Sequence, residues 1–231
     1  MKFVNNLHFE FCSEPFQHVV IDDFIKNEYI DQLLKEMDDL TIDKSYYYGN
    51  QNIEKNKYAF KSNFGEMIQE LFKEINGDEF VSLLENKTGI NGLIRNNLEL
   101  TGAGVHKIFD KGFLCMHKDF EGYTDAKYGL LDRRINLLLY MNKDWKEEYG
   151  GELCLYDDTK LHKVTKKIVP MLNRCVIFLT PGNIHGHPNP LNIPENISRQ
   201  SITTYYYTKN ETGKNLNGNE IQPVTWFYNI K

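Results

Sequence analysis

The feature that most constrains the fold is a series of short β-prone runs in the second half of the chain, over about 98–208. The runs are rich in Val, Ile, Leu, Phe and Tyr and are separated by Gly, Asn, Asp and Pro, which is typical of an antiparallel sandwich or barrel. They read GVHKIF, FLCMH, INLLLYMN, ELCLY, KKIVPML, RCVIFLT and SITTYYYT. The sequence therefore predicts a mainly β core.

The residues before this core have the periodicity of helices. A short strand at 17–23 is expected to end at Asp22 or Asp23, either of which can cap the following helix. Apolar residues then recur at helical spacing in three stretches, 27–40, 64–75 and 80–86. The first part of the chain is therefore predicted to be mainly helical.

The domain organisation follows from the lack of a linker. No low-complexity segment separates the helical portion, about 1–95, from the β core, so we predict a single domain over 1–231 with the helices packed on the sheet. A polar, Tyr- and Asn-rich segment at 41–60 is predicted to be a surface loop or a lid. The tail, 209–231, is expected to add an edge strand or to lie over the sheet.

Composition narrows the function classes. The formal charge of -5 and the pI near 5.8 give no general reason to expect attraction to nucleic acid or to an anionic membrane. No segment approaches the 18 or so uninterrupted apolar residues of a spanning helix. The cysteines, at 12, 115, 154 and 175, form no C-x-x-C pair, so neither a zinc knuckle nor a redox dithiol is indicated. We expect a cytoplasmic protein with reduced cysteines.

A histidine and an aspartate indicate a metal site. His117 and Asp119 stand two apart at the end of a predicted strand, so both side chains point to one face. A second cluster, NIHGHPNP, holds His185 and His187 and follows the apolar strand RCVIFL. Two histidines and one carboxylate leave positions open on an ion, as in ferrous oxygenases. An H-x-D pair alone, however, occurs often by chance.

A pair of residues suited to a carboxylate follows the second histidine cluster. Arg199 and Ser201 alternate onto one face of the strand SRQSITTYYYT, giving a guanidinium fork and a hydroxyl that suit a carboxylate. Taken alone, Arg199 is better explained as a surface arginine at the start of a strand.

Taken together, these segments resemble a known family. The stretch from about 101 to 208 resembles the 2-oxoglutarate and iron(II)-dependent oxygenases of the prolyl 4-hydroxylase-like branch, through GVHKIFDKGFLCMHKDF, RRINLLLYMNKDWKEEYGGELCLYD, VPMLNRCVIFLTPGNIHGHPNPL and SRQSITTYYYT. PFQHVVIDDFIKNEYIDQLLKE resembles the lead-in helix of bacterial members. The resemblance implies a double-stranded β-helix, that is, a jelly-roll or cupin-like core with N-terminal helices packed on the sheet.

The resemblance also implies the iron ligands. His117 and Asp119 match the H-x-D pair, and the third ligand falls in the H-G-H triplet. His185 is favoured over His187 because the ligand comes first in the family's H-x-V-x-P context. The resemblance implies no catalytic residue beyond these ligands.

The cosubstrate residues come from the same comparison. Arg199 and Ser201 match the R-x-S pair that binds the distal carboxylate of 2-oxoglutarate, and Tyr140 matches a tyrosine whose hydroxyl supports that carboxylate. Asn136 and Leu138 share the face of Tyr140 by alternation and are expected to line the same pocket.

The function implied is hydroxylation with Fe(II), 2-oxoglutarate and dioxygen. The substrate is expected to be a peptide or protein, such as a prolyl residue, or a small molecule or sugar in a biosynthetic pathway. One alternative is a non-catalytic cupin-like ligand-binding barrel. Another is a cupin-type metalloenzyme with more histidine ligands and no R-x-S pair. No nucleic acid or membrane partner is expected.

Overall fold

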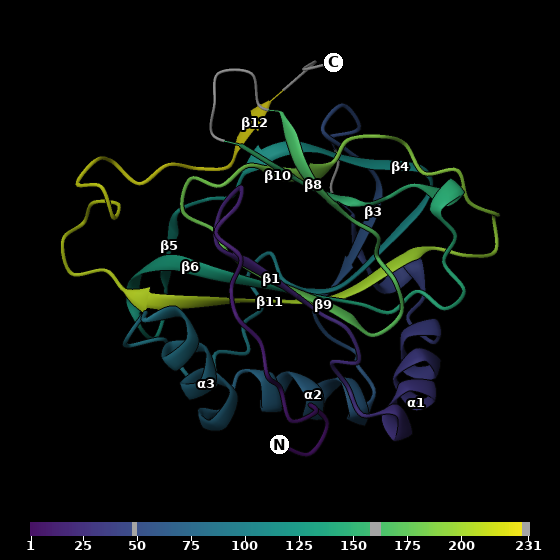
Figure 1. Cartoon of the computed structure of the whole chain (residues 1–231), viewed down its shortest axis with the longest axis horizontal. Coiled ribbons are helices and arrows are strands. Elements are labelled where there is room, and N and C mark those ends of the chain that lie inside the picture. Colours follow the sequence, from purple (N-terminus) through teal and green to yellow (C-terminus); the bar gives the residue numbers. More distant parts are fainter. Residues whose placement is uncertain (48–49, 158–162, 228–231) are drawn as a thin grey trace.

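The computed structural model describes residues 1–47, 50–157 and 163–227 (Figure 1). The helices are α1 (Asn27–Asp38), α2 (Glu66–Ile75) and α3 (Asp78–Thr88), with 3-10 turns at Ile42–Lys44 and Glu147–Tyr149. The strands are β1 (His18–Ile21), β2 (Tyr46–Tyr47), β3 (Glu54–Phe60), β4 (Gly104–Lys118), β5 (Gly122–Asp125), β6 (Gly129–Tyr140), β7 (Leu153–Tyr156), β8 (Val164–Ile168), β9 (Arg174–Leu179), β10 (His185–His187), β11 (Arg199–Lys209) and β12 (Thr225–Phe227).

The strands form one curled antiparallel sheet. Its hydrogen-bonded order is β1-β9-β6-β11-β4-β10-β7-β8, and β4 joins the two layers because its first half pairs with β11 and its second half with β10. The chain of β4 turns at Lys111, which has φ 59, and Gly112, where a Cβ would lie 2.6 Å from the carbonyl oxygen of Phe109. The result is the curled half-barrel of the double-stranded β-helix fold, as predicted (Figure 1).

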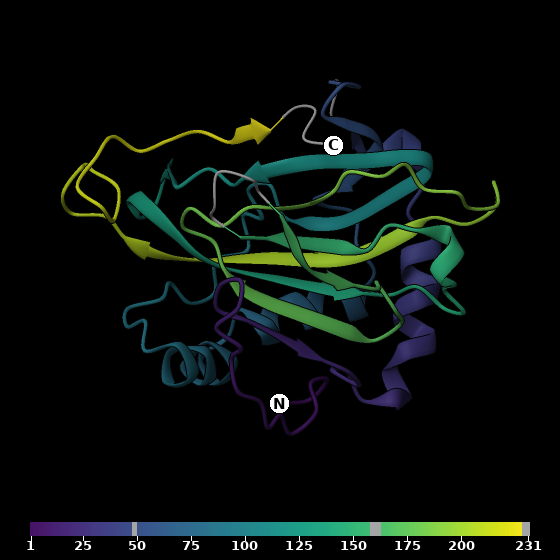
Figure 2. The same ribbon diagram turned by 45° about the horizontal axis from the view of Figure 1, so that its top comes forward.

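The helices cover one layer of the sheet. In Figures 1 and 2, α1, α2 and α3 lie against the outer side of the layer that holds β1, β9, β6 and β11, while β10 and β12 lie on the opposite side of the barrel. The N-terminus lies beside the helices, and β12 lies far from it. Within the described part of the chain, no helix is both long and apolar enough to span a membrane.

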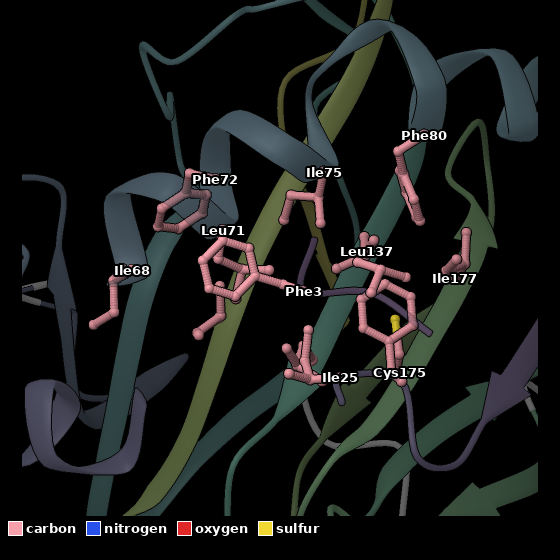
Figure 3. Close-up of a cluster of buried hydrophobic side chains, with 14 of the residues drawn as sticks. Phe3, Ile25, Ile68, Leu71, Phe72, Ile75, Phe80, Leu137, Cys175 and Ile177 are labelled. Carbon is pink, nitrogen blue, oxygen red and sulfur yellow. The ribbon is translucent and has the colours of Figure 1, made fainter. Parts of the chain in front are cut away.

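The main core lies between the helices and this layer. Figure 3 shows Leu71 and Ile75 of α2 facing Leu137 of β6 and Ile177 of β9. These four side chains are fully buried. Strand alternation then turns the intervening residues of β6, such as Leu138, toward the interior of the half-barrel. One face of β6 therefore stabilises the fold while the other is available for a site.

The structure corrects the N-terminal predictions in two places. Helix α1 is capped at Lys26 and not by Asp22 or Asp23, because the chain runs on past β1 before the helix begins. Much of the predicted loop at 41–60 is strand: β3 pairs with β4 over both of its halves. Its sequence, EKNKYAF, lacks apolar alternation because its middle residues are only half buried. Residues 48 and 49 of that segment lie outside the described residues.

The tail supplies an edge strand, which was one of its two predicted arrangements. Thr225–Phe227 pairs with the end of β4 so that Trp226 lies opposite His117. The tail therefore passes beside the residues predicted to hold metal, while residues 228–231 lie outside the described part of the chain.

Candidate active site

Two neighbouring strands bring the predicted metal-binding residues together. His117 near the end of β4 lies directly opposite His185 on β10, and their ring centroids are 4.4 Å apart. Asp119 follows β4 and places Oδ1 3.5 Å from Nε2 of His117 and Oδ2 3.5 Å from Nε2 of His185. One atom from each side chain can be chosen so that all lie within 4.8 Å of one another. This group is called the triad below.

Backbone carbonyls orient both imidazoles of the triad. Nδ1 of His117 lies 2.9 Å from the carbonyl oxygen of Cys115, and Nδ1 of His185 lies 3.4 Å from that of Asn183. An Nδ1–H that donates to a carbonyl leaves Nε2 with a free lone pair. Both free lone pairs then face the Asp119 carboxylate, so the three side chains offer donor atoms of the right chemistry to one cation.

Asp119 is held in the ionised form by two residues of β6. Nη2 of Arg133 lies 3.0 Å from Oδ2, and Nδ2 of Asn136 donates to the same oxygen at 2.8 Å. Burial raises the pKa of Asp119, but the Arg133 guanidinium and then His185 more than offset this and hold it well below its usual range. Burial also lowers the pKa of His185 to about 3, against the opposing effect of Asp119. A neutral imidazole beside a carboxylate is the form that binds metal.

The predicted carboxylate site lies on β11 and β6. Ser201 pairs with Tyr140 across these strands, and Nη2 of Arg199 donates to the Tyr140 hydroxyl at 3.3 Å. Nε of Arg199 donates to the carbonyl oxygen of Gly151 at 2.7 Å, which fixes the direction of the guanidinium. Gly151 is required here, because its φ is 75 and a Cβ would lie 2.6 Å from Leu191 and 2.9 Å from Cδ of Arg199.

One cavity of about 280 Å³ joins the triad to the carboxylate site. Its lining includes the triad and every residue of the predicted cosubstrate pocket, Asn136, Leu138, Tyr140, Arg199 and Ser201. The structure thus brings together in one cavity all the residues that sequence reasoning singled out. His187 lines the cavity too, but it is not part of the triad.

The comparisons with known proteins agree with this geometry. Residues 103–207 match the family profile of the 2OG-Fe(II) oxygenase superfamily. The matched stretch is slightly less than half of the chain. The chain is also 27% identical over 201 residues to a mouse (Mus musculus) protein named prolyl 3-hydroxylase OGFOD1, a match that covers 84% of this chain and 33% of the relative. The chain therefore spans about a third of the length of that curated relative.

Solved structures share the fold of this protein. A prolyl 4-hydroxylase from Pseudomonas putida superposes with a TM-score of 0.59 at 14% identity, covering 84% of this chain and 92% of the other. A prolyl hydroxylase from Trichoplax adhaerens, solved with a peptide fragment of the hypoxia inducible factor oxygen degradation domain, superposes with a TM-score of 0.60 at 19% identity, covering 83% of both chains. The fold class is therefore confirmed.

Sequence reasoning missed Arg133 of β6. Its guanidinium is stacked 3.5 Å from the Tyr205 ring centroid and donates to Oδ1 of Asn136. Simple alternation puts Arg133 and Asn136 on opposite faces of β6. The register with β11, however, shifts between Ile135 and Arg133, so an extra residue bulges here and turns Arg133 inward. The RR doublet before an apolar strand was the available signal, but a bulge cannot be recognised from one sequence.

Two further parts of the cavity wall were also missed. Glu54 and Lys57 of β3 form an ion pair of 3.0 Å that lines the cavity from the segment predicted to be a loop. Trp226 of β12 also lines the cavity, and its ring lies 4.9 Å from that of His117. Both segments are remote in sequence from the motifs, so spacing could not place them.

Proposed function

We propose that this protein hydroxylates its substrate with Fe(II), 2-oxoglutarate and dioxygen. The observation that carries the proposal is the single cavity that holds both the triad and the site formed by Arg199, Tyr140 and Ser201. A metal site alone fits many enzymes, whereas a buried guanidinium at the other end of the same cavity fits an organic dianion that also reaches the metal.

His117, Asp119 and His185 would hold the iron through two imidazole nitrogens and one carboxylate oxygen. Bound ferrous iron supplies the redox chemistry by which dioxygen converts 2-oxoglutarate to succinate and carbon dioxide and one oxygen atom enters a C–H bond of the substrate. The chain's own contribution is to keep Asp119 ionised, to point Nε2 of both histidines at its carboxylate and to leave the remaining positions on the metal free of protein ligands.

Arg199 and Ser201 would bind the distal carboxylate of 2-oxoglutarate. Arg199 is 5% exposed and Ser201 4%, so the charge pair forms where water is largely excluded and the attraction is strong. Tyr140 supports the guanidinium with its hydroxyl and its ring, which lies 4.8 Å away. Arg199→Ala should therefore raise the 2-oxoglutarate concentration needed for turnover by about tenfold or more, while iron still binds.

For the substrate, we propose a prolyl residue in a peptide or protein. The support is the similarity to relatives named as prolyl hydroxylases. Around the triad, the cavity wall includes Trp226, Val224 and Phe120, which are apolar groups suited to a pyrrolidine ring.

The test is a screen of proline-containing peptides with the iron-loaded protein, read by mass spectrometry and by succinate release. A gain of one oxygen on proline, dependent on 2-oxoglutarate, is expected. A panel of amino acids, sugars and other metabolites is run in parallel, and turnover confined to that panel would refute the prolyl assignment while leaving the reaction class intact. Metal-dependent activity without 2-oxoglutarate would refute the reaction class.

A further inference from the structure

Two buried histidines line the active-site cavity with ring nitrogens that have no hydrogen-bond partner in the described part of the chain. His187 of β10 is 3% exposed, and both Nδ1 and Nε2 lack a partner. His106 of β4 is 7% exposed, and its Nε2 lacks one. Buried polar atoms are nearly always paired because an unpaired one lowers stability. Unpaired atoms on a cavity wall therefore indicate a ligand that pairs with them.

His106 lies beside the carboxylate site. In the sheet register it pairs with Ser201, and Ser201 pairs in turn with Tyr140, so the three form one row across β4, β11 and β6. All three line the cavity, and directly opposed residues in an antiparallel sheet have Cβ atoms about 4.5–5.5 Å apart. The imidazole of His106 is thus a neighbour of the hydroxyl that we assign to the distal carboxylate.

His187 lies nearer to the triad. It is two residues beyond His185 on β10 and pairs with Leu114 of β4, three residues before His117. Like the triad and Arg199, it lines the cavity. A ligand that spans from the triad to Arg199 therefore occupies the cavity that His187 lines.

Both histidines carry an N–H that can be donated. Burial lowers the pKa of His106 well below the usual range, and the positive charges of Lys57 and Arg199 lower it further. A neutral imidazole has one N–H and one lone pair. In a cavity that already holds the Arg199 cation, an anionic oxygen is the ligand atom that best pairs with such an N–H.

We propose that His106 and His187 are further binding residues for the 2-oxo acid. Nε2–H of His106 donates to the carboxylate that Arg199 and Ser201 hold, and His187 donates to an oxygen at the end nearer the triad. The inference rests on the proposed function. His106 would then make the site select a dicarboxylic 2-oxo acid over a monocarboxylic one.

The test measures binding and not turnover. Nickel-loaded protein is titrated by calorimetry with 2-oxoglutarate and with pyruvate, which has no distal carboxylate. His106→Leu should weaken 2-oxoglutarate about tenfold or more, because a hydrogen bond to a charged group is lost, and should leave pyruvate unchanged. His187→Leu should weaken both acids. His106→Gln keeps an amide N–H near the position of Nε2 and should restore most of the affinity for 2-oxoglutarate.

His18 provides a matched control. It is 1% exposed on β1, its Nε2 also lacks a partner in the described residues, and it does not line the cavity. His18→Leu should therefore leave both affinities unchanged. Thermal unfolding without ligand shows whether each variant folds. If His106→Leu does not fold, the test compares the 2-oxoglutarate affinity of His106→Gln with that of His106→Asn.

Each of the remaining outcomes would overturn one part of the proposal. Wild-type affinity for 2-oxoglutarate in both leucine variants would overturn the role of the two histidines but not the proposed function. Equal weakening of pyruvate and 2-oxoglutarate in His106→Leu would overturn the placement of His106 at the distal carboxylate. Loss of nickel in His187→Leu would make His187 a metal-binding residue and overturn its role here. Failure of the wild-type nickel protein to bind 2-oxoglutarate would overturn the proposed function and the inference with it.

Discussion

Replacing Arg133 by Met is expected to destabilise the metal-free protein strongly. The guanidinium is 2% exposed and lies 3.0 Å from Asp119, whose side chain is 10% exposed. It also donates to Oδ1 of Asn136 at 2.8 Å from Nη2 and 3.0 Å from Nε. Methionine fills much of the same space but leaves a buried carboxylate without its cation. Breaking a buried ion pair in this way costs about 3–5 kcal/mol, a large part of the roughly 5–15 kcal/mol that stabilises a typical domain.

Urea unfolding of metal-free protein at neutral pH measures this loss. In an Asp119→Asn background the uncompensated carboxylate is gone, so Arg133→Met should cost less there by about 1–3 kcal/mol. Arg134→Met is the matched control: Arg134 is the neighbouring bulge residue, only half-buried, and donates to Thr208. It should cost about 1 kcal/mol. A loss below about 1 kcal/mol for Arg133→Met, or the same loss with and without the Asp119 carboxylate, would refute the reasoning.

Three further perturbations test the cosubstrate site and the fold. Gly151→Ala should lower stability by about 1–3 kcal/mol and also weaken 2-oxoglutarate binding. Gly150→Ala is the control: φ is also positive there, but a Cβ would meet nothing closer than 3.9 Å, so only the backbone strain should lower stability. Calorimetry measures binding and thermal unfolding measures stability, and equal 2-oxoglutarate affinity in both variants would contradict the contact between Gly151 and Arg199. Burial raises the pKa of Glu85, but its ion pair with Arg95 at 2.6 Å and the hydrogen bond it accepts from the backbone N–H of Leu93 more than offset this and lower it. A carboxylate with a lowered pKa in the folded state stabilises the fold at pH values above its unfolded pKa of about 4.3, so wild type should be more stable than Glu85→Gln by about 1 kcal/mol at pH 7 and should lose this advantage as the pH falls below about 4. The same difference in stability in urea titrations at pH 3 would contradict the sign of the pKa shift. Leu71→Ala removes a fully buried side chain between α2 and the sheet and should cost about 2–5 kcal/mol by the same assay, so a cost under 1 kcal/mol would place α2 outside the core.

Most of the β core could be predicted from the sequence because its strands alternate or are uniformly apolar. INLLLYMN, for example, is buried on both faces, between the helices and the cavity, and its apolar run is unmistakable. EKNKYAF is equally a strand, but it is recognisable only from its pairing with β4, which is a long-range contact. The helices were predicted to within a few residues, since each has one apolar face. The cap of α1 could not be predicted, because it depends on the path of the chain between β1 and the helix.

The site residues that belong to sequence motifs could be predicted. Those that a bulge or a distant segment supplies could not. His117, Arg199 and Ser201 lie on strands and Asp119 directly follows β4, so the shared face of each pair follows from a period of two. Arg133 faces the triad only because of a bulge in β6, and that depends on the register with β11. The assignment of His185 and not His187 to the metal stays a prediction, which the geometry of the triad supports.

The most direct test of the proposed function is the conversion of 2-oxoglutarate to succinate by the purified, iron-loaded protein. Wild type is expected to form succinate in an oxygen-dependent manner, even slowly without substrate, and to lose this activity when iron is removed. Asp119→Ala should abolish succinate formation although the fold is retained, as circular dichroism will verify. Succinate formation that is unchanged in Asp119→Ala, or absent from the iron-loaded wild type in the presence of oxygen, would contradict the assignment of this site.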